Sequence, residues 1–97
     1  MKTMLTAVAW MLAFVAAGPA HAQATAEDLV KSSGCTSCHD KAVRKVGPSW
    51  KDIAAKFKGS ADADKLLVAQ LKEGRGHPVT KASEADITTM VKFVLAQ

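Results

Sequence analysis

The sequence predicts an all-α fold of about four helices. Four segments each begin with a residue that commonly caps a helix, and apolar side chains then follow at helical spacing. No stretch competes with these by alternating apolar and polar residues, the pattern that is typical of a β-strand. The chain has 97 residues, which is enough for one domain only.

The first predicted helix begins at residues 25–28 (Thr-Ala-Glu-Asp) and stops at Gly34. Residues 25–28 match a capping box, in which a side chain at each end satisfies a free backbone N–H. The second helix begins at residues 49–52 (Ser-Trp-Lys-Asp) and ends at Gly59. The apolar positions of these two helices are Leu29 and Val30 in the first and Trp50, Ile53, Ala54 and Phe57 in the second.

The third predicted helix begins near Asp62 and runs to Gly74, because glycine commonly ends a helix. The fourth begins at Ser83, with Asp86 three residues later. Their apolar positions are Leu66, Leu67 and Leu71 in the third and Ile87, Met90, Val91, Val94 and Leu95 in the fourth. The segments 35–48 and 74–82 between helices are long for so small a domain, which indicates functional loops.

The N-terminus has the pattern of a secretory signal peptide. Lys2 precedes an uncharged apolar run over residues 4–17, and Ala-His-Ala at residues 20–22 forms a cleavage site of the A-x-A type. We therefore expect residues 1–22 to be a signal peptide and residues 23–97 to form the exported domain. The alternative is a retained membrane anchor, but the apolar run is shorter than the roughly 20 residues that a membrane span needs.

The remaining chain is poor in large side chains that could fill a core. Its aromatic residues are Trp50, Phe57 and Phe93, and a domain this short usually needs a disulfide, a metal or a cofactor for stability. The net charge of the full 97-residue chain is +4, with basic residues interspersed among acidic ones and no dense basic block. This distribution argues against a nucleic-acid-binding protein.

Residues 35–39 read Cys-Thr-Ser-Cys-His, the C-x-x-C-H pattern of covalent haem attachment. Two thiols add across the two vinyl groups on one side of haem, and the two intervening residues let both sulfurs reach that edge. The next residue then lies under the iron. The sequence therefore predicts one covalent haem c, attached through Cys35 and Cys38, with His39 as an axial iron ligand.

Three other interpretations of the motif are open at this point. A redox-active dithiol is disfavoured because no βαβ pattern surrounds the cysteines. A disulfide between Cys35 and Cys38 is compatible with an exported protein. A zinc site would use both cysteines with His39 and His77, although adjacent Cys38 and His39 would have to bend back onto the same ion.

Three segments resemble the small bacterial class I cytochromes c, and together the resemblance covers nearly all of residues 23–97. Residues 31–39 resemble the end of the family's N-terminal helix running into the haem motif. Residues 45–57 resemble its V-G-P-x-[YW]-x-x-[IV]-A-x-[KR]-[YF] segment, and residues 84–96 its C-terminal helix. The resemblance implies a cytochrome c fold, with about four helices wrapped around one covalent haem.

The same resemblance implies roles for individual residues around the haem. The Pro48 carbonyl would accept a hydrogen bond from Nδ1 of His39, which would orient the ring and raise its basicity. Trp50 would lie near a propionate or the haem edge. Phe93 would pack the last helix against the first.

The chain departs from the family pattern at the sixth iron ligand. The family places a methionine, usually followed by proline, in the loop before the last helix, whereas residues 73–80 read Glu-Gly-Arg-Gly-His-Pro-Val-Thr. His77 and Pro78 stand in the place of that methionine and proline, so we expect His77 to bind the iron. Met90 is the alternative, but its helical spacing favours a core position. A lysine ligand or an open iron are further alternatives.

Two imidazole ligands predict a comparatively low reduction potential, because a methionine ligand favours ferrous iron. The expected function is electron transfer in the periplasm with redox partner proteins, as a soluble carrier or a small subunit of an oxidoreductase, without enzymatic activity. The alternative is a haem-based sensor of small ligands or a weak peroxidase, which would need a displaceable His77. Basic side chains around the haem opening would steer an acidic partner: Lys41, Arg44, Lys45, Lys56, Lys72, Arg75 and Lys81.

Overall fold

The computed structural model describes residues 25–97, and the predicted signal peptide, residues 1–22, lies outside the described residues. Within the described part, the only β pairing is an isolated bridge between His39 and Arg44, so the all-α prediction is confirmed. The elements in chain order are α1 (Ala26–Ser32), a 3₁₀ turn η1 (Cys35–Ser37), α2 (Trp50–Phe57), α3 (Ala63–Glu73) and α4 (Glu84–Leu95).

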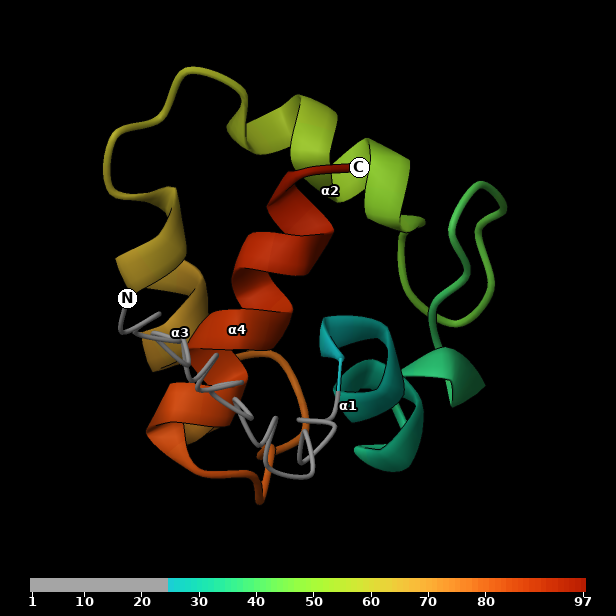
Figure 1. The fold of residues 1–97 in the computed structure, drawn as a ribbon. Coiled ribbons are helices and arrows are strands. Elements are labelled where there is room, and N and C mark those ends of the chain that lie inside the picture. The colour runs from blue at the N-terminus through green and yellow to red at the C-terminus, as the bar shows by residue number, and fades with distance from the viewer. Residues whose placement is uncertain (1–24) are drawn as a thin grey trace, which may run out of the picture.

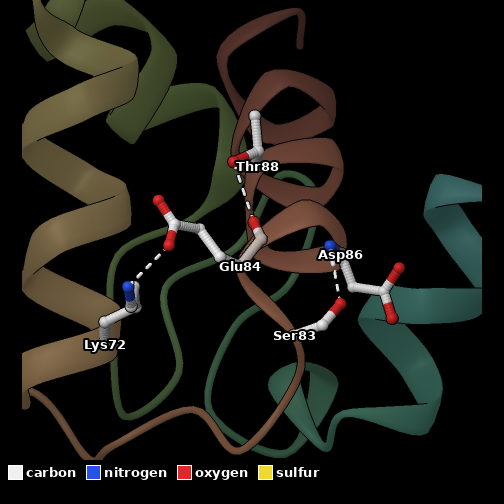
Figure 2. Close-up of polar contacts among 5 residues, drawn as sticks. All are labelled: Lys72, Ser83, Glu84, Asp86 and Thr88. Atoms are coloured by element: carbon white, nitrogen blue, oxygen red, sulfur yellow. Dashed lines mark hydrogen bonds and ion pairs between the residues drawn. The ribbon is translucent and has the colours of Figure 1, made fainter.

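Each helix begins directly after the capping residue that the sequence indicates. At α1 the Thr25 hydroxyl accepts from the Asp28 N–H at 3.2 Å, and the Asp28 carboxylate accepts from the Thr25 N–H at 3.3 Å, which completes the capping box. The hydroxyls of Ser49 and Ser83 each accept from the backbone N–H three residues later, at 3.1 and 3.2 Å, and the second bond is drawn in Figure 2. Local side-chain chemistry therefore fixes where these helices start.

The last helix is the centre of the fold. Figure 1 shows α4 between the other helices, and it packs against α1, α2 and α3. Phe93 of α4 and Leu29 of α1 are both partly buried against the core formed there. The buried apolar core comprises Val30, Trp50, Val68, Ile87, Met90, Val91 and Val94.

Two long segments without regular helix connect these elements, at residues 38–49 and 74–83. The second joins α3 to α4, and an ion pair between Lys72 Nζ and Glu84 Oε2, 2.7 Å apart, closes its base (Figure 2). This pair lowers the pKa of the Glu84 carboxyl below its ordinary value. No helix in residues 25–97 combines the length and the apolar character that crossing a bilayer requires.

The turn η1 has no counterpart among the elements that the sequence indicates. It is three residues long, which is typical of 3₁₀ helices but too short to show any apolar periodicity. The first helix also ends earlier than Gly34, because Ser33 forms its C-cap. Gly34 instead begins η1 in the left-handed backbone conformation, with φ of 77°.

Met90 is a core side chain, only 3% exposed among the apolar residues of α4. We therefore predict that the cost of replacing it depends on the volume that is lost. Met90→Leu, which nearly conserves volume, should lower the free energy of unfolding by less than about 1.5 kcal/mol. Met90→Ala leaves a cavity and should lower it by about 2–5 kcal/mol. Denaturant titration measures both losses, with Leu66→Ala as an exposed control expected to change stability by about 0.5 kcal/mol at most.

Candidate functional site

The C-x-x-C-H motif forms a tight turn directly after α1. The backbone N–H groups of Cys38 and His39 both donate to the Cys35 carbonyl, at 3.2 and 3.0 Å. Both cysteines are partly buried, and neither is in a disulfide. Because these hydrogen bonds close the turn on itself, the two thiols and the imidazole are presented by one short, internally bonded segment.

Burial raises the pKa of the Cys35 thiol above its ordinary value; a hydrogen bond from backbone opposes this shift, and the neighbouring Cys38 adds to it. The group is therefore a neutral thiol near pH 7. A neutral thiol carries both the sulfur and the hydrogen that are needed for addition across a carbon–carbon double bond. This is the chemistry by which a vinyl group becomes a thioether.

The His39 ring is buried, with contacts on two sides. Its Nδ1 lies 2.5 Å from the Pro48 carbonyl oxygen, and the Trp50 ring stacks on it with centroids 4.6 Å apart and planes 22° apart. A carbonyl can only accept, so Nδ1 carries the proton and Nε2 has a free lone pair in the neutral ring. The hydrogen bond implied by the family resemblance is thus present, whereas the stacking of Trp50 on the imidazole was not expected.

Gly47 is a site residue that sequence reasoning missed. A Cβ built at this position would lie 2.9 Å from Nδ1 and 3.0 Å from Nε2 of His39, closer than side chains ordinarily approach. The Gly47 N–H also donates to the Cys38 carbonyl at 2.8 Å. The glycine of the V-G-P pattern directly before Pro48 was the sequence feature that could have revealed this close approach.

Between the motif and α2 the chain folds into a compact loop. The Asp40 carboxylate accepts from the backbone N–H groups of residues 42 and 43, both at 2.9 Å, and these bonds lower the pKa of Asp40. The Asp40 carbonyl in turn accepts from the Trp50 N–H at 2.9 Å. Lys45 Nζ donates to the Thr36 carbonyl at 2.9 Å. The loop therefore ties the motif turn to the first residue of α2.

His77 lies in the segment between α3 and α4, and its ring comes close to the ring of His39 in the motif. Its ring centre is 6.1 Å from that of His39, and the two ring planes differ by 13°. A metal–imidazole bond is about 2.0 Å long, so two imidazoles on opposite sides of one ion have ring centres roughly 6 Å apart once the ring radii are added. The distance between the two ring centres is therefore compatible with a metal ion held between the imidazoles.

The other candidate for the sixth ligand lies elsewhere. Met90 is in the buried core of α4, as its helical spacing indicated. Within residues 25–97, no three side chains of His, Cys, Asp or Glu gather closely enough to hold a metal ion by themselves.

Curated relatives match most of the chain. Cytochrome c-551 of Pseudomonas aeruginosa is 38% identical, over 90% of this chain and 94% of the relative. Cytochrome c-552 of Hydrogenobacter thermophilus is also 38% identical, over 72% of this chain and 79% of the relative. No protein-family profile matches the chain.

Solved structures agree with these relatives. The class 1 cytochrome MtoD of Sideroxydans lithotrophicus superposes with a TM-score of 0.64 at 29% identity, over 73% of this chain and 90% of that protein. Wild-type cytochrome c552 of Nitrosomonas europaea superposes with a TM-score of 0.63 at 31% identity, over 71% of this chain and 95% of that protein. The chain therefore belongs to the class I c-type cytochromes, electron carriers rather than enzymes, with one covalently attached haem c.

Proposed function

We propose that this chain is an exported, periplasmic electron carrier in which His39 and His77 bind the two axial positions of the haem iron. The haem, attached through Cys35 and Cys38, supplies a centre that gains and loses one electron. The observation that carries the proposal is the pair of nearly parallel imidazoles with centres 6.1 Å apart. The donor set supports it, because two thiols and two imidazoles suit covalent haem and low-spin iron.

Ligation by two imidazoles points to a low-potential step. The methionine common in this position is a soft thioether that stabilises ferrous iron and raises the potential. An imidazole in its place favours the ferric form by comparison. The proposed carrier therefore delivers electrons at a lower potential than a relative of the same fold with methionine in the sixth position.

The residues around His39 keep its ring in one orientation. Pro48 accepts from Nδ1 at 2.5 Å, and Trp50 covers a face of the ring. This leaves Nε2 as the nitrogen that would bind the iron, and the hydrogen bond at Nδ1 would raise its basicity. Trp50 is only 7% exposed, so it also excludes water from that side of the ring.

Encounter with a redox partner protein relies on fewer basic side chains than the sequence offers. Lys72 pairs with Glu84, and Arg75 pairs with Glu73. Lys45 donates to a carbonyl of the motif turn. The two ion pairs reduce what Lys72 and Arg75 add to a positive field. Steering of an acidic partner therefore falls mainly to the other basic side chains expected around the haem opening: Lys41, Arg44, Lys45, Lys56 and Lys81.

The exported protein should carry one covalent haem and should begin at Gln23. Intact mass spectrometry of the purified periplasmic protein should give residues 23–97 plus one haem, because cleavage follows Ala22 and two thioethers survive denaturation. Replacing Cys35 and Cys38 together by alanine should remove the haem mass and the haem absorption. Retention of residues 1–22 in a membrane fraction would contradict export as a cleaved protein.

Replacing His77 should change the iron directly. His77→Ala should leave a site open to solvent, so that the ferrous protein binds carbon monoxide rapidly where the wild type does not. His77→Met should raise the reduction potential by on the order of 0.1 V or more, within the roughly 0.8 V that axial ligands span. Visible spectroscopy with and without carbon monoxide, and potentiometric titration, measure the two effects.

Met90→Leu serves as the matched control for these variants, because Met90 is the other candidate ligand. It should leave the visible spectrum and the rate of carbon monoxide binding at wild-type values. If Met90→Leu opened the iron while His77→Ala left the spectrum unchanged, both the assignment of His77 and the low-potential argument would be wrong.

Gly47→Ala should disturb His39 specifically. The new methyl group would overlap the imidazole, so the ring must move away from Pro48, with a loss of about 1–3 kcal/mol of stability from overpacking. The weakened hydrogen bond should also raise the reduction potential, because the imidazole becomes a poorer donor to ferric iron. Potentiometry and denaturant titration check the two outcomes.

Gly59→Ala is the control for that variant. Gly59 has φ of 80°, and a Cβ added there would have no other atom within 4 Å, so alanine should cost about 1–2 kcal/mol of backbone strain alone. Its potential should stay at the wild-type value. Equal shifts of potential in the two variants would show that Gly47 acts through general stability rather than through His39.

A further inference from the structure

His77 makes a hydrogen bond of its own that fixes how it can bind a metal. Its Nδ1 lies 2.8 Å from the carbonyl oxygen of Pro78. Since a carbonyl oxygen has no proton to give, Nδ1 must be the donor, and the neutral ring then keeps its lone pair on Nε2. The bond selects one of the two tautomers, and this tautomer leaves Nε2 free for a metal.

His39, which lies in another part of the chain, has the same kind of hydrogen bond. There Nδ1 donates to the carbonyl of Pro48, at 2.5 Å. Both imidazoles thus place Nδ1 on a prolyl carbonyl, although the sequence separations are nine residues and one residue. The two rings are also nearly parallel, with 13° between their planes.

We propose that the Pro78 carbonyl is a positioning group for His77, so that both axial imidazoles reach the iron through Nε2 with similar donor strength and parallel planes. This rests on the proposed ligation by His77 and deepens it, because it assigns the group that orients that ligand. In metal sites such a partner on the second ring nitrogen fixes the tautomer and the ring orientation and raises basicity.

Proline is suited to this task at position 78. The proline ring fixes φ at about −65°, so ψ is the only backbone torsion of Pro78 that remains free to orient its carbonyl. It also biases the preceding residue, His77, toward extended backbone. The two residues therefore form a unit with few alternative conformations, and little conformational entropy is lost when the Nδ1 hydrogen bond forms.

Hydrogen bonds to α3 hold the rest of the segment between α3 and α4, so His77 and Pro78 have a defined position. The Thr80 N–H donates to the Leu71 carbonyl at 2.9 Å, and the Gln70 side chain donates to the Arg75 carbonyl at 3.1 Å. Figure 2 shows the ion pair of Lys72 with the first residue of α4, which closes the loop at its base. These contacts connect the loop to α3 on both sides of His77.

A close approach at Gly74 shows how tightly the loop folds over the end of α3. Gly74 has φ of 70°, and a Cβ there would lie 2.7 Å from Val79 Cγ2 and 3.2 Å from the His77 carbonyl oxygen. A side chain at Gly74 would push apart the residues that flank Pro78. The backbone around His77 and Pro78 is therefore constrained by sterics as well as by hydrogen bonds.

The test compares Pro78→Gly with Lys81→Gly in the haem-loaded protein. Glycine at 78 frees the torsion that aims the carbonyl, whereas glycine at 81 adds the same flexibility elsewhere in the loop. Pro78→Gly should raise the affinity of the ferrous protein for carbon monoxide about tenfold, the lower end of what loss of such a partner costs a metal site. Lys81→Gly should leave this affinity unchanged.

Two spectroscopic readouts report on orientation rather than on stability. Parallel imidazole planes give a rhombic ferric electron paramagnetic resonance spectrum, which should be seen in the wild type and broaden or split in Pro78→Gly. In the diamagnetic ferrous protein, ¹⁵N-histidine spectra should show a proton on Nδ1 of His77 at the hydrogen-bonded shift also found for His39. Equal behaviour of the two glycine variants, or a His77 Nδ1 proton at the shift of a solvent-exposed imidazole, would overturn the proposal.

The experiments distinguish an error in the assignment of His77 as a ligand from an error in the role of Pro78. If His77→Ala leaves the spectrum and the binding of carbon monoxide unchanged, then His77 does not bind the iron and the proposed function is wrong at that point. If His77→Ala opens the iron while Pro78→Gly matches Lys81→Gly, His77 is a ligand but the Pro78 carbonyl does not position it.

Discussion

The hydrogen bond from His39 to the Pro48 carbonyl is the constraint on which the rest of the site depends. It spans 2.5 Å and joins the haem-attachment turn to the residues that lead into α2. Trp50, the first residue of α2, covers a face of the same imidazole and also belongs to the buried core. Because α2 packs on α4, the orientation of one ring is coupled to the central helix of the fold. Gly47 completes this arrangement, since a larger residue would occupy the space of the ring.

The helical core is small, and two long connecting segments carry the histidines of the site. A few apolar residues from each helix meet around α4, and such a short chain buries too little surface to be strongly stable by itself. The two long connecting segments carry His39 and His77, and hydrogen bonds that involve backbone groups tie both to the neighbouring helices and the first also to the motif turn. This construction is consistent with a domain that takes part of its stability from a cofactor held between the loops.

The proposed ligation by His77 would distinguish this chain from relatives of the same fold that have methionine at the sixth position. A loop that presents an imidazole has to control tautomer as well as distance, whereas a thioether has no such requirement. In this chain the carbonyl of Pro78, 2.8 Å from Nδ1 of His77, is the group that we propose for that control. Under the proposed ligation, two imidazoles of similar donor strength would stabilise the ferric state, so substitution near either ring is expected to change the reduction potential.

The sequence by itself determined the helices and the cofactor. Thr25, Ser49 and Ser83 cap the helices that their patterns indicated, because capping bonds reach only three residues along the chain. The spacing in C-x-x-C-H likewise follows from local chemistry, and the family relatives confirm the haem c that it implies. The family resemblance already placed His77 opposite His39, but only the tertiary structure decided the geometry of these contacts: the nearly parallel planes of the two histidine rings, the stacking of Trp50 on His39, and the absence of room at Gly47. Such contacts depend on how the loops close over the helices, and a periodic pattern along the chain contains no information on that closure.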